Sequence, residues 1–150
     1  MKRIFVLMMM MMVVLTGCGN KEKENIDAKK VAEQLLNDVT YDSNMDQMSD
    51  DMIALLYDID TEDVSKQIVY CSTDATADEI AVFEATSKEA AGRIETAVKQ
   101  RVDDQKSSFE GYVPKEVEKL EKAVVKKIGN VVILDVSNDS DKANEIISKY

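Results

Sequence analysis

The chain begins with an apolar segment that no polar residue interrupts, and its pattern changes sharply after that segment. Residues 4–15 are all apolar, and Lys2 and Arg3 stand before them. A basic start followed by a short apolar stretch is typical of a secretory signal peptide. A membrane-spanning helix needs about 20 apolar residues, which is more than this stretch offers. The pattern therefore predicts an export signal at residues 1–17 rather than a buried helix.

Beyond the signal, apolar residues recur at spacings of three and four, which predicts amphipathic helices. They are expected from about 27 to 40, from Ser49 to Tyr57, along a long stripe at 91–109, from Pro114 onward, and after Asn138-Asp139. The sequence Thr86-Ser87-Lys88-Glu89 matches the Thr-x-x-Glu capping box, so we expect Thr86 to open the long helix. Polar turn formers at 41–47 are expected only to separate the first two helices.

Four short segments rich in β-branched residues, 66–72, 79–85, 123–128 and 131–136, are expected as strands. Turn formers at 73–78 join the first two, and Gly129-Asn130 is a tight-hairpin signal between the others. Residues 80–94 align with 133–147 at a constant offset of 53, so each half is expected to fold as strand, strand, helix. We therefore expect an α+β fold with two ββα units forming a four-stranded antiparallel sheet packed with helices, preceded by two N-terminal helices.

The expected central strands are apolar on both faces, whereas a sheet with one solvated face should alternate apolar and polar residues. Ile80 and Val82 would point to one face, and Ala81 and Phe83 to the other. Either the N-terminal helices or a partner must cover the second face, and we expect the helices to do so.

The end of the signal resembles the lipobox of bacterial lipoproteins: Leu15, Thr16 and Gly17 precede Cys18. The resemblance implies that a diacylglyceryl group is attached to the Cys18 sulfur and that cleavage leaves Cys18 first. Two acyl chains are enough for stable attachment to a lipid bilayer. The expected organisation is a signal peptide at 1–17, lipidated Cys18 with a flexible tether at 18–26, and a single domain at 27–150 on the extracytoplasmic face of the cell membrane.

Composition excludes several kinds of chemistry. The chain has a net charge of −10 and no His, so it offers neither the basic face that nucleic acid requires nor an imidazole base. Cys71 is the only Cys besides Cys18, and it lies in an apolar run where we expect a buried strand residue. Residues 58–62 open like a calcium loop, but Asp63 and Val69 stand where such a loop needs Gly and Glu. We expect neither a metal site nor a cofactor.

Gln105 is the polar exception on the apolar stripe of the long helix. A buried amide must find hydrogen-bond partners, because leaving it unpaired costs stability. It is expected either to bond to the loop backbone beneath Tyr112 or to orient a ligand in a pocket.

Four segments in this order, 55–64, 77–83, 101–105 with 112–114, and 129–134, resemble one family. They are similar to small clostridial-type lipoproteins with domain of unknown function 4358, over roughly residues 27–150. The resemblance implies an exported bacterial lipoprotein. It brings no established activity, so no functional residue is carried over.

Three functions remain open for the exposed domain. The first is a non-enzymatic module that binds another envelope protein or a cationic ligand. The second is a small solute-binding or transport-accessory lipoprotein. The third is a hydrolase that uses carboxylates alone, although neighbours such as Asp103-Asp104 do not face each other on a helix. We expect the first, and no enzymatic activity.

Overall fold

The structure is a computed structural model that describes residues 26–150. The predicted signal peptide, the lipobox Leu15–Cys18 and nearly all of the tether lie outside the described residues. The described residues form helices and one antiparallel sheet, in the order α1 (Ala28–Asp38), β1 (Met45–Gln47), α2 (Asp50–Leu56), the 3-10 turn η1 (Thr61–Asp63), β2 (Val64–Ser72), β3 (Glu79–Ala85), α3 (Lys88–Phe109), α4 (Pro114–Glu121), β4 (Val124–Ile128), β5 (Val131–Val136) and α5 (Ser140–Ile147).

The sheet has five strands in the order β1-β2-β3-β5-β4, and every neighbouring pair is antiparallel. Both predicted hairpins are confirmed, with Gly129 at φ +58° in the tight turn, a conformation that glycine adopts without steric cost. The expected number of four strands was wrong, because β1 arises within the segment expected to form only a turn. That strand is short and polar, and its backbone pairs with Tyr70–Ser72, so no apolar alternation marks it in the sequence.

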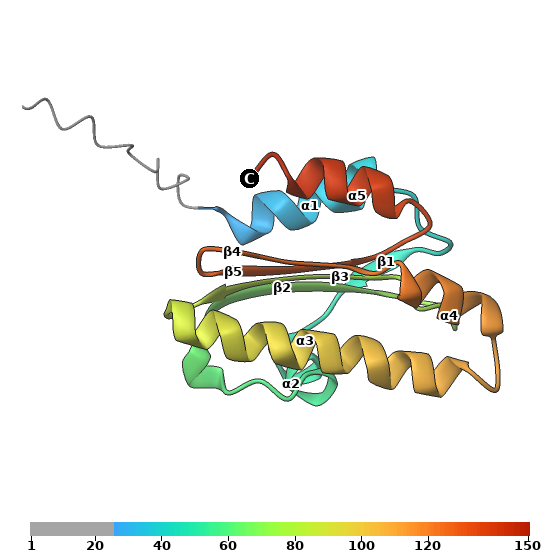
Figure 1. Ribbon diagram of the computed structural model, residues 1–150, viewed down its shortest axis with the longest axis horizontal. Helices are drawn as coiled ribbons and strands as arrows, with labels where there is room; N and C mark the ends of the chain where they lie inside the picture. Colours follow the sequence, from blue (N-terminus) through green and yellow to red (C-terminus); the bar gives the residue numbers. More distant parts are fainter. Residues whose placement is uncertain (1–25) are drawn as a thin grey trace, which may run out of the picture.

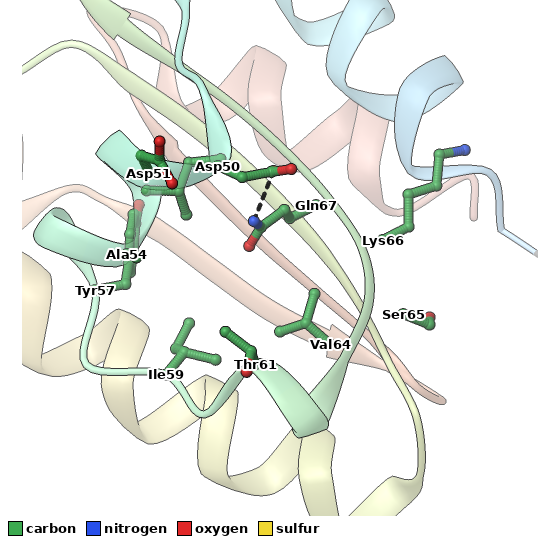
Figure 2. A pocket seen from close by; sticks show the side chains of 11 residues that line it. Asp50, Asp51, Ala54, Tyr57, Ile59, Thr61, Val64, Ser65, Lys66 and Gln67 are labelled. Atoms are coloured by element: carbon green, nitrogen blue, oxygen red, sulfur yellow. Dashed lines mark hydrogen bonds between the residues drawn. The ribbon is translucent and has the colours of Figure 1, made fainter.

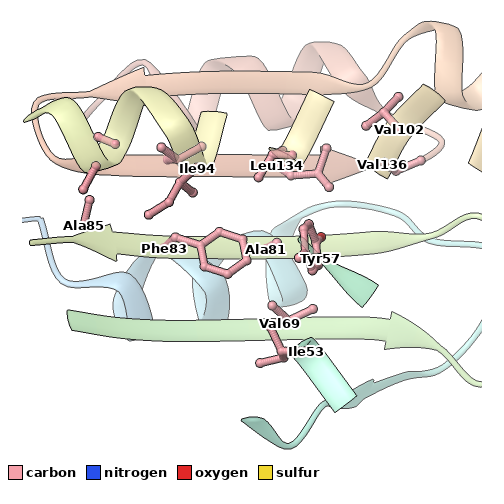
Figure 3. Packing of buried hydrophobic residues seen from close by; sticks show 14 of the residues in the cluster. Ile53, Tyr57, Val69, Ala81, Phe83, Ala85, Ile94, Val102, Leu134 and Val136 are labelled. Carbon is pink, nitrogen blue, oxygen red and sulfur yellow. The ribbon is translucent and has the colours of Figure 1, made fainter. Parts of the chain in front are cut away.

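Helices cover both faces of the sheet, as Figure 1 shows. On one face, α2, α3 and α4 pack over a cluster that contains Phe83 and Leu134. In this cluster the Tyr57 and Phe83 rings meet edge to face, with centroids 5.1 Å apart, and Ile53 packs beside Val69 (Figure 3). On the other face, α1 and α5 pack over Ile80, Val82 and Ile133. The helix α1 therefore covers the second face as expected, whereas α2 lies on the same face as α3.

The two predicted ββα units are not equivalent in space, which corrects the expected repeat. The central strands β3 and β5 are antiparallel neighbours, so a twofold axis that exchanges them would be perpendicular to the sheet. Such an axis would place both of the helices that follow these strands on the same face. Instead, α3 and α5 lie on opposite faces. The face that the repeat would assign to α5 is covered by α3, which has 22 residues and contacts β3, β4 and β5, together with α2 and α4.

The start of α3 also differs by one residue from the predicted capping box. The N-cap is Ser87, whose hydroxyl accepts a hydrogen bond from the Ala90 N–H at 3.0 Å. The Thr86 hydroxyl instead donates to the Glu62 carbonyl at 3.2 Å. Thr86 thus ties the end of β3 to η1. The expected caps Ser49 and Asp139 are confirmed.

Candidate functional site

A buried carboxylate, Glu79, lies at the end of the sheet where β2 ends and β3 begins, and only 1% of this residue is exposed. Its Oε2 accepts hydrogen bonds from Arg101 Nη2 at 2.9 Å and from Gln105 Nε2 at 2.6 Å. The Tyr57 hydroxyl donates to Oε1. Burial, and then the charge of Glu79, raise the pKa of Tyr57, so the phenol stays protonated as a donor. We call these four residues the Glu79 cluster.

The Glu79 cluster identifies the hydrogen-bond partner of Gln105, which the sequence left open between the loop backbone and a ligand. Its amide nitrogen bonds to a carboxylate on β3 rather than to the loop after α3. Tyr112 lies in that loop with 77% of its surface exposed, so the two residues do not share a site. Gln105 therefore has a structural role on the side of α3 that faces the sheet.

Lys119 forms a second buried cluster that fastens α4 to the same end of the sheet. Its Nζ lies 2.6 Å from Asp78 Oδ1, 2.9 Å from Asp42 Oδ2 and 3.0 Å from Glu116 Oε2. Burial lowers the pKa of Lys119, but the hydrogen bonds to these carboxylates outweigh it and leave the pKa raised. Glu116 also accepts the Ala77 N–H at 2.8 Å. The ammonium therefore stays charged and holds three segments together.

A third cluster surrounds the buried carboxylate of Asp135, which lies on β5 facing α1 and α5. It accepts hydrogen bonds from the Tyr41 hydroxyl at 2.6 Å and from the Ser137 hydroxyl at 2.5 Å. Burial raises the pKa of Asp135 to about 6, and these two hydrogen bonds act against that rise. A raised carboxyl pKa is common at catalytic sites, so Asp135 needs to be compared with the surface around it.

The buried polar groups of these clusters have their hydrogen-bond partners within the fold. Among the described residues, every buried side-chain nitrogen and oxygen has a hydrogen-bond partner. Neither Glu79 nor Asp135 lines either of two hollows in the described surface, although Tyr57, which donates to Glu79, lines one of them. Burial, and then Glu79, raise the pKa of the Cys71 thiol to about 12, which keeps it protonated and unreactive. No group of His, Cys, Asp or Glu within 26–150 is arranged to hold a metal ion.

One of the hollows is a groove of about 510 Å³ between α2 and β2, which we call the α2 groove. Figure 2 shows residues of α2 along one side, Val64 and Gln67 on the other, and Ile59 and Thr61 between them. Its lining is apolar toward the core, where Ile53 is only 3% exposed. Its rim carries Asp50, Asp51, Lys66 and Gln67.

The groove lies beside an open strand edge. The short strand β1 pairs only with Tyr70–Ser72 of β2, and Met48 adds one hydrogen bond from its N–H to the Val69 carbonyl at 2.8 Å. The chain then turns away at Ser49, the N-cap of α2. In the described part of the chain, no strand pairs with the outer edge of β2 from Val64 to Ile68.

The outer face of α2 adds exposed apolar surface near this edge. Met52 and Leu55 are 46% and 80% exposed, and they lie three residues apart on one side of the helix. Gln67 Nε2 donates to Asp50 Oδ1 at 2.8 Å, which holds the start of α2 to β2. Met52 and Leu55 do not line the groove, but they flank it on α2. The groove and the open edge beside it form the surface most suited to binding.

Sequence analysis missed the Glu79 cluster and the groove for different reasons. Each of two apolar strand segments carries a charged residue, Glu79 at the start of one and Asp135 within the other. In addition, Arg101 and Gln105 are four residues apart, which places them on one face of a helix. That signal could have indicated buried ion pairing. The groove left no sequence signal, because it depends on where β1 stops pairing.

No described helix has the combination of length and apolar content that crossing a bilayer requires. No curated protein and no solved structure matches the chain. A family model described as "Domain of unknown function (DUF4358)" matches residues 37–146. The match includes α2, β2 and the whole α2 groove. The chain therefore belongs to the DUF4358 family, as its sequence resemblance indicated.

Proposed function

We propose that the protein is a lipid-anchored lipoprotein on the extracytoplasmic face of the cell membrane, and that its domain binds another protein of the cell envelope. The observation that carries the binding role is the α2 groove beside the open edge of β2. A groove with an apolar interior, a charged rim and unpaired backbone next to it suits a polypeptide partner, because both side chains and main chain can be recognised there.

The arrangement of charged groups supports binding rather than catalysis. Hydrolysis by carboxylates needs two of them facing a cleft, with one pKa raised. Asp135 has a raised pKa, but only 1% of it is exposed, and it is bonded to Tyr41 and Ser137. The buried carboxylates thus serve the fold, and the groove is free for a partner.

The lipid anchor is supported by the order Leu15-Thr16-Gly17-Cys18 after an apolar segment. A chain anchored at Cys18 would place α1, which begins at Ala28, close to the bilayer. Because the thioether requires a thiol, Cys18→Ala should release the protein from the membrane fraction. Continued retention of the variant at wild-type level would contradict the anchor.

The binding role can be tested by photo-crosslinking in the cells that produce the protein. A photoreactive phenylalanine analogue replaces Leu55 on α2 in one protein and Tyr112 in the control. The two side chains are similarly exposed, at 80% and 77%, and Tyr112 follows the end of α3 that is remote from η1 (Figure 1). We expect a protein adduct from position 55 and not from position 112. Equal labelling, or no adduct from position 55, would contradict the proposal.

A further inference from the structure

We propose that the α2 groove takes an extended, basic segment of the partner protein, which pairs with the open edge of β2 as an added strand. This inference rests on the proposed function and names the partner's chemistry. Strand addition requires a row of unpaired backbone groups, and selectivity comes from alternate side chains that enter neighbouring pockets.

The backbone of β2 presents such groups beside the groove. In an antiparallel strand the hydrogen-bonding direction alternates from residue to residue. The Ser72 N–H donates toward β3, to the Asp78 carbonyl at 3.0 Å, whereas the Val69 carbonyl accepts from Met48 on the β1 side. By this alternation the N–H and C=O of Gln67 point outward, just past the residue where β1 stops. A polar backbone pair at this position gains two hydrogen bonds from an added strand.

The other edge of the sheet, β4, lacks these properties. It is five residues long and carries the exposed neighbours Lys126 and Lys127. Lys127 Nζ lies 2.8 Å from Glu95 Oε2, whereas Lys126 forms no ion pair within residues 26–150 and leaves its charge at this edge, where it opposes edge pairing. The lysine on the β2 edge does not serve that purpose, because Lys66 Nζ is held 2.8 Å from Asp27 Oδ1 at the start of α1. The charge of Lys126 therefore discourages pairing at β4, whereas the charge of Lys66 is drawn away from the β2 edge.

The charge of the groove selects the partner's side chains. Asp50 and Asp51 lie at the start of α2, and Lys66 is the only basic residue in the lining. The interior is apolar, with Ile53, Ile59 and Val64. A strand that alternates apolar residues with Lys or Arg would fill the interior and place a cation near the two carboxylates. A second copy of this chain, with its net charge of −10, would bring like charge instead.

Four variants test the mode of binding, each carrying the photoreactive residue at position 55 in the full chain. Gln67→Pro removes the outward N–H, and proline is tolerated on an edge strand. Gln67→Ala is its control, because it keeps the N–H and loses only the side-chain bond to Asp50. Asp51→Lys reverses the charge at the groove. Its control is Asp141→Lys, an exposed residue in the first turn of α5, where the same change alters the helix dipole equally.

We expect Gln67→Pro and Asp51→Lys each to lower the yield of adduct on the order of tenfold, the effect of losing about 1.4 kcal/mol of binding. The loss in Gln67→Pro is measured relative to Gln67→Ala, which lacks the same side chain and differs only in keeping the N–H. The loss in Asp51→Lys is measured relative to Asp141→Lys, which should retain most of the adduct. Mass spectrometry of the adduct should identify an extended segment containing Lys or Arg. Circular dichroism of each purified variant checks its folding. If Gln67→Pro does not fold, the comparison of Asp51→Lys with Asp141→Lys tests the proposal.

The outcomes separate the two proposals. Adducts that persist at full yield in folded Gln67→Pro and in Asp51→Lys would overturn strand addition and leave the binding role intact. An adduct to another copy of this chain, or to an acidic segment, would also overturn it. Absence of any adduct in the unmodified background would instead contradict the proposed function itself.

Discussion

Replacing Arg101 by methionine should show that the Glu79 cluster holds α3 to the sheet. The Glu79 residue is 1% exposed, and the Arg101 guanidinium provides two of its hydrogen bonds, at 2.9 Å and 3.4 Å. Removing one partner of a buried ion pair costs about 3–5 kcal/mol, because the other charge stays buried and unpaired. Tyr57 and Gln105 would still donate to Glu79. We therefore expect a loss near the lower end, about 3 kcal/mol of the free energy of unfolding.

The matched control is Arg93→Met on the same helix. Arg93 also donates two hydrogen bonds to one carboxylate, from Nε to Asp63 Oδ2 at 2.7 Å and from Nη2 to Asp63 Oδ1 at 2.5 Å. Its side chain, however, is 62% exposed. The Asp63 side chain is 12% exposed, but water reaches the pair from the exposed Arg93 side and screens its charges, which reduces the contribution of the pair. Arg93→Met should therefore lower the free energy of unfolding by less than Arg101→Met.

Urea denaturation followed by far-ultraviolet circular dichroism measures both losses, since the chain has no Trp to report by fluorescence. A third variant combines Glu79→Gln with Arg101→Met. It removes the buried charge together with its partner and should recover about half or more of the loss. Equal losses for Arg101→Met and Arg93→Met, or no recovery in the double variant, would refute the reasoning from burial.

Three further predictions concern Asp135, Gly92 and Gly129. The pKa of Asp135 is about 6 in the folded chain and lower when unfolded, so between pH 4 and 6 the folded state binds more protons and stability falls as the pH rises. This decline amounts to about 3 kcal/mol of the free energy of unfolding, and Asp135→Asn should remove it. Urea denaturation of both proteins at pH 4 and pH 7 measures the difference. The same pH dependence in Asp135→Asn as in the unmodified protein would contradict the burial of that charge. Gly92→Ala inside α3 should raise the free energy of unfolding by about 1 kcal/mol, because a Cβ there meets no atom within 4 Å. Gly129→Ala should lower it by about 1 kcal/mol because of its φ of +58°, and thermal melts of both variants would show opposite shifts.

The elements that the sequence predicted well are those with strong local signals. Spacing along α3 placed Ala91, Ile94 and Val98 on its buried side, and Gly129-Asn130 marked the turn between β4 and β5. In each case the signal lies within neighbouring residues and depends on backbone preference or on one buried face. The repeat was misleading because alignment of strands carries no information about which face the next helix covers.

The candidate site was less accessible from the sequence, because it depends on contacts between distant segments. The open edge of β2 results from the turn at Ser49, where the chain stops pairing and begins α2. Two partners of Glu79 lie 22 and 26 residues away on α3, and the third, Tyr57, follows α2. Gln105 was correctly singled out as a buried polar residue, but its partner could be identified only once β3 and α3 were brought together.

Amide hydrogen exchange at Gln67 tests the open edge most directly. In the free protein, the outward N–H of Gln67 should exchange faster than that of Ile68, which faces β3. Addition of the partner segment identified by cross-linking, prepared as a synthetic peptide, should slow exchange at Gln67 and leave Ile68 unchanged. Binding of that peptide without protection of the Gln67 amide would contradict the pairing of a partner strand with β2.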